Sequence, residues 1–294
     1  MKILCFIFFA LLTFNQIFAS TTKPISSNTL QKVRESSLLS NIPHCLEIEK
    51  NLVEISVSYY GVDNKVHTNG LIIVHKSVAK YVVKIFNDLQ KANFNIFGID
   101  PFKGFVIQNK EVIVDDDYNY TGSYSCRLMV GGSSPSRHSL GMAIDINPLF
   151  NPFLQVNIQT KVIENIVPKN GIFYLNRDPV RPNKPDRFGV ITKDIVNIFA
   201  QNGFTTWGGY WDFPLDYHHF ELSSNLAQLL LAMKDNDGEK MFEVHVRYYN
   251  KKHTEIVLAL MEHFELKEVK DLIEIYKQNP SNFFNIISNN IARF

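Results

Sequence analysis

The length, composition and charge of the chain exclude several classes of protein. Its 294 residues are enough for one large domain or two small ones, and a hydrophobic content of 45% is ample for a packed core. The 30 Lys and Arg residues nearly balance the 29 Asp and Glu residues, so no bulk positive charge exists to hold nucleic acid or an anionic membrane. Composition therefore argues against intrinsic disorder and against a nucleic-acid partner.

The first residues have the composition of a secretory signal. Lys2 precedes an apolar run from Ile3 to Phe14, and Ala19 provides a small residue at the expected cleavage position. The run is shorter than the ~20 apolar residues that a membrane-spanning helix needs, which favours cleavage over retention as an anchor. We therefore predict a signal peptide, export to the periplasm or the extracellular space, and no membrane span in the mature chain.

Cysteine usage agrees with export. Cys5 lies inside the predicted signal, which leaves Cys45 and Cys126 in the mature chain. Two thiols in an oxidising compartment can form one disulfide. Their spacing in the sequence leaves open whether these two residues meet.

The next segments predict a leader, a hairpin and a helix. Residues 20–44 are rich in Ser, Thr, Asn and Lys and lack sustained periodicity, which predicts an extended leader before the folded body. Alternating apolar side chains over residues 52–60, followed beyond a polar turn by an apolar run over residues 70–74, predict a β-hairpin. Apolar residues at helical spacing over residues 77–91 predict an amphipathic helix that covers the sheet.

Helical patterns return in the second half of the chain. Residues 193–201 form an amphipathic segment that ends at Asn-Gly, a good C-terminal cap. Ser223 and Ser224 can cap a helix through Met233, and two or three further helices are predicted beyond it. The predicted organisation is a signal peptide (1–19), a leader (20–44), a central domain (45–222) and a helical extension (223–294).

One segment in the middle of the chain offers a first pair of metal ligands, His138 and Asp145. Their separation is compatible with a loop that leads into a strand, and Gly141 would let the backbone turn between them. By itself this spacing is a weak signal, because a surface histidine and an unrelated aspartate would also produce it. Ser136 is expected to support the His138 loop by hydrogen bonding, since no base is evident beside it to make it a nucleophile.

A second segment offers two adjacent histidines and a spare carboxylate, Asp216. In an extended segment the two histidines point to opposite faces, so only one ligates easily. We predict that His219, directly before Phe220 in a strand-like stretch, is the ligand and that His218 is a hydrogen-bonded or partly exposed side chain. Two imidazoles and one carboxylate would leave the fourth zinc position for water, as a hydrolytic site requires.

Aromatic residues precede this second segment. Trp207, Gly208, Gly209 and Trp211 could form a tight turn with an aromatic wall beside a ligand groove. Packing in the core is the alternative, and for Trp211 the sequence does not separate the two.

Combined, these motifs are far more specific than either one alone. They read Ser136-x-His138-x-x-Gly141-x-Ala143-x-Asp145, Trp207-Gly208-Gly209-x-Trp211 and Asp216-x-x-His219-Phe220-Glu221. The combination resembles the VanY-like family of zinc D-alanyl-D-alanine carboxypeptidases and L-alanyl-D-glutamate endopeptidases. The resemblance extends more loosely over residues 52–222, and the C-terminal helical stretch has no counterpart in it.

The resemblance implies a fold and a set of roles. The fold would be α+β, with a small central antiparallel sheet flanked by helices that carries His138, Asp145 and His219 as zinc ligands. Asp216 would be the general base, and Arg127 matches a family arginine that helps to hold the scissile carbonyl. The implied activity is hydrolysis of peptide bonds in peptidoglycan stem peptides by metal-activated water. An aspartate as base beside Trp-Gly-Gly favours the endopeptidase branch.

Two other functions stay open at this stage. A non-catalytic, zinc-stabilised binding module of the same fold would keep the ligands but has no need of Asp216, and a closed shell with His218 as fourth ligand would favour it. The second open function is that of an exported effector that processes a host peptide. The bond that is cut, the role of the C-terminal helices and the oligomeric state are not readable from the sequence.

Overall fold

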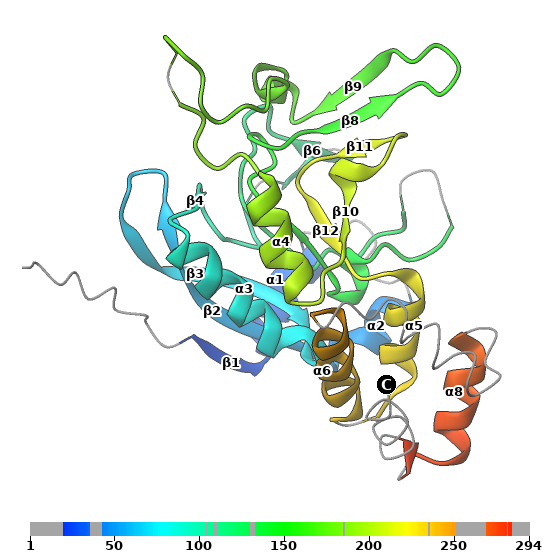
Figure 1. The fold of residues 1–294 in the computed structure, drawn as a ribbon. Helices are drawn as coiled ribbons and strands as arrows, with labels where there is room; N and C mark the ends of the chain where they lie inside the picture. The colour runs from blue at the N-terminus through cyan, green and yellow to red at the C-terminus, as the bar shows by residue number, and fades with distance from the viewer. Residues whose placement is uncertain are drawn as a thin grey trace, which may run out of the picture.

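The structure, a computed structural model, has an α+β fold in which short antiparallel sheets pack with helices (Figure 1). The predicted signal, residues 1–19, lies outside the described residues. The structure describes residues 20–35, 43–103, 105–108, 111–129, 133–184, 186–234, 236–250, 269–280 and 282–283.

The largest sheet is built on the predicted hairpin. Strands β2 (Leu52–Gly61) and β3 (Val66–His75) pair antiparallel. Strand β1 (Thr21–Pro24) adds to the outer edge of β2 in the antiparallel sense, and β4 (Asn95–Ile96) pairs parallel with the end of the same strand. The hairpin prediction is confirmed.

The N-terminal residues belong to this layer. Helix α1 (Ser27–Glu35) follows β1, and Val33 on it is buried in the core. The buried carboxylate of Glu54 on β2 accepts a hydrogen bond from the backbone N–H of Ser26 (2.7 Å) and pairs with Lys23 (3.1 Å). The expectation of an extended leader is wrong for these residues, because distant partners on β2 order them where local periodicity is absent.

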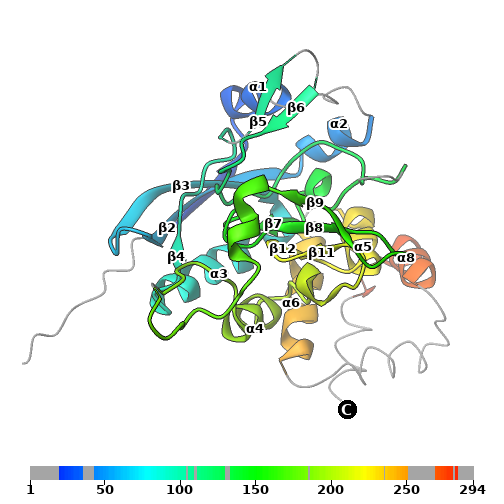
Figure 2. The same cartoon turned by 90° about the horizontal axis from the view of Figure 1, so that it is seen from above.

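Helices cover both sides of the sheet. After a short turn, η1 (Lys76–Val78), helix α3 (Ala79–Lys91) buries its apolar side chains against the sheet, as its spacing predicts. Helix α1 and helix α2 (Pro43–Glu49) lie on the other side (Figure 2). The core therefore forms between these layers.

Three smaller sheets contain the other strands of the described residues. One has the order β10-β12-β7, another has the order β11-β8-β9, and β5 pairs with β6. All of these pairings are antiparallel. The strands are β5 (Phe105–Gln108), β6 (Glu111–Val114), β7 (Ala143–Asp145), β8 (Phe153–Val156), β9 (Ile163–Val167), β10 (Thr206–Trp207), β11 (Leu215–Asp216) and β12 (His219–Glu221).

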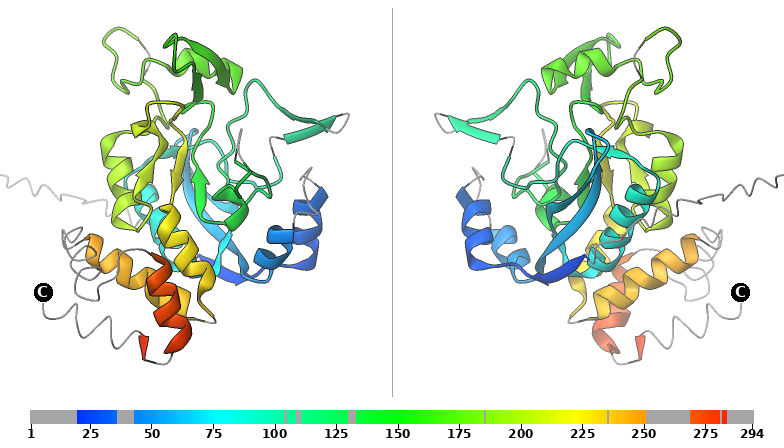
Figure 3. Two further views of the ribbon diagram at one scale, coloured as in Figure 1. Left: turned by 90° about the vertical axis from the view of Figure 1, so that its right-hand side faces the viewer. Right: turned by 90° about the vertical axis from the view of Figure 1, so that its left-hand side faces the viewer.

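The later helices follow their sequence signals. The predicted helix over residues 193–201 is α4 (Lys193–Gln201), and the Ser223 side chain accepts a hydrogen bond from the N–H of Leu226 at the start of the next helix. Helices α5, α6 and α8 lie at the end of the molecule opposite β8 and β9 (Figure 3). They are α5 (Ser224–Ala232), α6 (Asp237–Tyr249) and α8 (Val269–Gln278).

The pairing of the cysteines bears on the predicted export. Cys45 on α2 and Cys126 form a disulfide, with their Cα atoms 6.0 Å apart, so the pairing that the sequence left open is present. Every helix in the described ranges falls short of the length and apolar character needed to cross a bilayer.

Candidate metal centre

The pairing of β7 with β12 brings the two motifs together. Asp145 and His219 stand directly opposite each other in the register of these strands. His138 begins the short helical turn η2 (His138–Leu140), and Gly141 follows with φ 64°, a left-handed conformation that glycine adopts without strain. The backbone then enters β7, so the predicted sequence of loop, glycine turn and strand is confirmed.

The three predicted ligands form a compact triangle of donor atoms. Nε2 of His138 lies 3.1 Å from Nδ1 of His219 and 3.2 Å from Oδ2 of Asp145. Nδ1 of His219 lies 3.1 Å from Oδ1 of Asp145. Donor atoms bound to one tetrahedral zinc at ~2.1 Å are roughly 3.4 Å apart, so the triangle needs only a small expansion to hold an ion. The group is therefore suited to hold a metal.

The outward-facing nitrogens of the two histidines are also engaged. Nδ1 of His138 donates to the carbonyl oxygen of Ser123 (2.5 Å), and Nε2 of His219 donates to Oε2 of Glu221 (3.1 Å). Each bond places one ring proton away from the triangle, so that the inner nitrogen can offer its lone pair once a metal displaces any proton on it. Both rings are almost fully buried, with 3% and 6% of their surface exposed.

Electrostatics at the triangle favour a cation. Burial alone would lower the pKa of His219, but hydrogen bonds to Asp145 and Glu221 raise it to about 10. Burial would raise the pKa of Asp145, yet the neighbouring His138 and His218 outweigh it and hold that pKa well below its usual range. The carboxylates thus stabilise positive charge at this point, and a dication can take the place of the proton.

Asp216, on β11, lies beside the triangle with an unsatisfied oxygen. Its Oδ1 is buried and lies 3.1 Å from Nε2 of His218, but it accepts no hydrogen bond of good geometry from any residue that the structure describes. A Cβ on Gly208 would come within 2.5 Å of the Asp216 carbonyl oxygen and 2.8 Å of its Cβ. The Trp-Gly-Gly turn therefore needs glycine so that Asp216 can pack this closely. A buried carboxylate oxygen that accepts no well-aligned hydrogen bond is suited to accept a proton from a polar reactant.

His218 does not point away from the site, and the expectation of opposite faces is wrong. Residues 217 and 218 form a turn before β12 instead of an extended strand, so both imidazoles converge on Asp145. Nδ1 of His218 donates to the carbonyl oxygen of Asn151 (2.8 Å). Its Nε2 lies 3.1 Å from Oδ1 of Asp216 and 3.8 Å from Oδ2 of Asp145.

Arg127 lies on the segment that flanks the His138 loop. Its carbonyl oxygen accepts a hydrogen bond from the backbone N–H of Ser136 (3.1 Å). The Ser136 hydroxyl in turn accepts from the N–H of His138 (3.3 Å), which is the supporting contact predicted for it. The disulfide at Cys126 anchors the same segment to α2.

The two tryptophans differ in their surroundings. Trp207 packs against the core residue Phe220 and donates from Nε1 to the carbonyl oxygen of Tyr217 (2.9 Å). Trp211 is half-buried, and its ring centroid lies 5.5 Å from that of His219. Trp211 therefore forms a wall beside the candidate ligand His219, whereas Trp207 fixes the backbone that precedes His219.

Two residues that contact the site, Glu221 and Asn151, have no role in the prediction from sequence. Glu221 sits two residues after His219 on the same strand, and this i, i+2 spacing is a signal that places both side chains on one face. Asn151 holds His218 through its main chain, a contact that no local pattern indicates.

Comparison with known proteins identifies the segment that carries these residues. Residues 130–222 match a family model described as D-alanyl-D-alanine carboxypeptidase. The match confirms the resemblance to the VanY-like peptidases over the region that holds the ligand triangle and Asp216. No curated protein and no solved structure was found to match the chain.

Proposed function

Because residues 130–222 match this peptidase family, we propose that the protein is an exported zinc peptidase that hydrolyses peptide bonds in peptidoglycan stem peptides. The observation that carries the proposal is the juxtaposition of three donor atoms at 3.1–3.2 Å with the unsatisfied oxygen of Asp216. The triangle can hold a metal, and the buried carboxylate beside it can move a proton.

Zinc is the metal that this donor set suits. His138, His219 and Asp145 would hold the ion, since two imidazoles and one carboxylate are typical of catalytic zinc sites with an open position. A bound zinc ion would supply Lewis acidity and lower the pKa of a coordinated water toward ~7. Ser123 and Glu221 would orient the ligating rings through the hydrogen bonds described above.

The chain's own residues would carry the proton transfers. Asp216 would accept the proton of the attacking water at Oδ1 and return it to the leaving amine. Arg127 would place positive charge toward the scissile carbonyl as the oxyanion develops. His218, 3.1 Å from Asp216, would hold that carboxylate in position.

The substrate bond has two candidates within the family. A D-alanyl-D-alanine carboxypeptidase removes the terminal residue of the stem peptide, and an L-alanyl-D-glutamate endopeptidase cuts nearer the glycan. The family description favours the first, and the aspartate at position 216 after the Trp-Gly-Gly turn favours the second. Both activities require the protein outside the cytoplasm, and the disulfide between Cys45 and Cys126 supports that location.

The test is hydrolysis of defined muropeptides by the mature chain, residues 20–294, with products identified by mass spectrometry. We expect release of D-alanine or cleavage after L-alanine, loss of activity with a chelator and recovery with zinc. Asp216→Asn should lower kcat by about 100-fold or more, as expected for loss of a general base. Asp212→Asn, the same change at an exposed neighbour, should retain activity.

The same experiment separates a peptidase from a zinc-stabilised binding module. A module would bind zinc and the muropeptide but release no product, and its metal would be held by four protein ligands, including His218. In the structure His218 is closer to Asp216 (3.1 Å) than to the carboxylate of Asp145 (3.8 Å), which favours the peptidase. Retention of full activity in Asp216→Asn would refute the proposed mechanism.

A further inference from the structure

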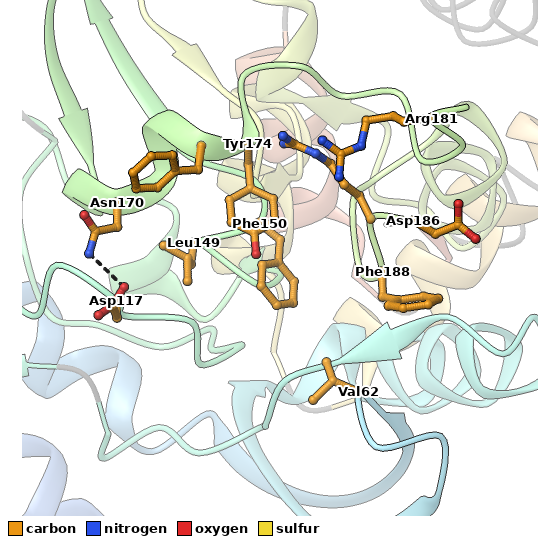
Figure 4. Close-up of a pocket in the computed structure, with 11 residues that line it drawn as sticks. Val62, Asp117, Leu149, Phe150, Asn170, Tyr174, Arg181, Asp186 and Phe188 are labelled. Atoms are coloured by element: carbon orange, nitrogen blue, oxygen red, sulfur yellow. Dashed lines mark hydrogen bonds between the residues drawn. The ribbon is translucent and has the colours of Figure 1, made fainter. Parts of the chain in front are cut away.

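A cavity of about 490 Å³ lies beside the loop after β7, the loop whose residue Asn151 accepts the hydrogen bond from His218. Its walls come from the turn between β2 and β3, Asp117 after β6, the loop after β7, the helical turn η3 (Lys169–Tyr174) and a later stretch with Arg181, Asp186, Arg187 and Phe188 (Figure 4). Within the described part of the chain, its lining does not include His138, Asp145 or His219. The cavity is thus separate from the metal centre.

Two arginines share one wall of this cavity. Figure 4 shows the guanidinium of Arg181 directed inward near Tyr174. Arg187 lies over the Tyr174 ring, 5.0 Å from its centroid, and its buried Nη1 finds no hydrogen-bond partner among the residues described. Burial lowers the pKa of Arg187, and the positive charge of Arg181 lowers it further. The two guanidiniums thus line the same cavity with like charge.

A third guanidinium stands behind this pair. Arg177 donates from Nη2 to Oδ1 of Asn151 (2.8 Å) and to the carbonyl oxygen of Ile191 (3.1 Å). It stacks on Tyr217 at 4.1 Å, and its own pKa is lowered to about 10 by burial, with a smaller contribution from the charge of Arg187. Positive charge therefore extends from the cavity wall into the protein.

The acids that line the cavity do not turn toward this wall. Asp117 accepts a hydrogen bond from Nδ2 of Asn170 (2.9 Å), on the far side of the cavity from Arg181 (Figure 4). Asp186 is exposed, and its carboxylate is directed away from the guanidinium of Arg181. Among the described residues, the buried Nη1 of Arg187 is thus a cationic donor that the lining leaves without a hydrogen-bond partner.

Aromatic rings form the rest of the interior. Phe150 and Tyr174 pack with their centroids 4.9 Å apart, and Phe188 is half-exposed, with 53% of its surface accessible. We propose that this cavity binds a carboxylate-bearing ligand, whose charged group is held by Arg181 and Arg187 and whose apolar part lies on these rings. The planar guanidinium fork matches a carboxylate in geometry and charge, and an anion between two guanidiniums removes their repulsion.

The carboxylate can come from the peptide that is hydrolysed or from a separate small molecule. Phe150 lies on the loop that also carries Asn151, whose carbonyl oxygen accepts the hydrogen bond from His218. An occupant of the cavity therefore contacts a loop that holds a residue of the metal centre. The binding chemistry is the same for either source.

The test uses metal-free mature protein, so that it is independent of peptidase activity. Binding of benzoate and of the neutral isostere benzamide is measured by isothermal titration calorimetry. We expect benzoate to bind at least about tenfold more tightly than benzamide, because only the carboxylate pairs with the arginines. Equal affinity for the two probes, or no binding of benzoate, would overturn the proposal.

Variants locate the binding to the cavity. Arg187→Gln and Arg181→Gln should each weaken benzoate binding by about tenfold or more, and Arg187→Lys should retain part of it. Lys184→Gln, which removes an exposed cation from the same segment, is the matched control and should bind as the wild type does. Unchanged binding in both arginine variants would place benzoate elsewhere and refute the site.

The source of the carboxylate is assigned by displacement. A stem peptide with a free terminal carboxylate and its amidated form are each titrated against bound benzoate. Displacement by the free acid alone identifies the peptide as the occupant, and its failure to displace benzoate identifies a separate small carboxylate. Either result supports a carboxylate site, while equal displacement by both peptides contradicts it.

Discussion

His219 faces two carboxylates at once: its Nδ1 lies 3.1 Å from Oδ1 of Asp145, and its Nε2 donates to Oε2 of Glu221 over the same distance. The strand β12 carries His219 and Glu221 on one face, and its pairing with β7 supplies Asp145. One imidazole is thereby oriented from both of its nitrogens, which is the arrangement that histidine ligands of metals commonly have.

Replacing Glu221 with Gln should weaken metal binding. The variant keeps the size of the side chain but removes the charge that orients His219 and increases its basicity, so we expect metal affinity to fall about 10- to 100-fold. Competition with a chromogenic chelator measures the affinity directly. Glu47→Gln, the same change on an exposed part of α2, should leave it unchanged. Equal affinities for the two variants would show that Glu221 does not support the site.

Metal affinity should rise with pH. The metal-free protein holds a proton on His219, whose pKa is raised to about 10, and a metal must displace that proton to bind Nδ1. Because the pKa of Asp145 lies well below its usual range, that carboxylate releases no proton near neutrality. We expect affinity to increase about tenfold per pH unit between pH 6.5 and 8.5, as for release of one proton. An affinity that is flat above pH 7 would contradict a raised His219 pKa.

Gly208→Ala should impair turnover without removing the metal. The added Cβ would come within 2.5 Å of the Asp216 carbonyl oxygen, so the backbone that carries the proposed base must shift. A displacement of about 1 Å can lower kcat by roughly 100-fold, and we expect an effect of this size with normal metal content. At Gly122 a Cβ would meet no atom of the described residues within 4 Å, so Gly122→Ala is the control. Normal turnover in Gly208→Ala would count against Asp216 as the base.

Glu54→Gln should lower stability near neutral pH and not in acid. Burial would raise the pKa of Glu54, but hydrogen bonds from Thr29, Ser26 and Lys23 lower it from 4.5 to about 2. Its ionised form therefore stabilises the fold above the unfolded pKa, and this contribution is lost as pH falls through about 2. We expect urea unfolding at pH 7 to show a loss of about 2 kcal/mol in the variant. The difference from wild type should shrink between about pH 4.5 and pH 2, and a difference independent of pH would contradict this.

Removal of the disulfide should lower the free energy of unfolding. Cys45 and Cys126 are separated by 81 residues in the sequence, and closing a loop of this length stabilises a folded chain by about 4 kcal/mol in the chain-entropy account. The double variant Cys45→Ser, Cys126→Ser should unfold at lower denaturant concentration than the wild type. A reductant should shift the wild type toward the double variant and leave the double variant unchanged. A wild type insensitive to reductant would show that the thiols are not bonded in solution.

Local pattern was sufficient where neighbours in the sequence determine the structure. The hairpin of β2 and β3, the helices α3 and α4, and the Ser223 cap follow from alternation, helical spacing and capping chemistry, which act over a few residues. The motif residues His138, Asp145 and His219 were also identifiable, because their spacing and residue types suit a metal site that the tertiary structure assembles.

Tertiary structure alone decided the features that depend on distant partners. The segment Thr21–Glu35 folds because the edge of β2 and the carboxylate of Glu54 satisfy its backbone, which composition does not reveal. His218 turns toward Asp216 because the chain bends before β12, and a two-residue turn reverses the alternation expected of a strand. The cavity with Arg181 and Arg187 arises where five separate segments meet. The sequence by itself therefore determined which side chains could bind a metal, and only packing between distant strands and loops decided which groups surround them.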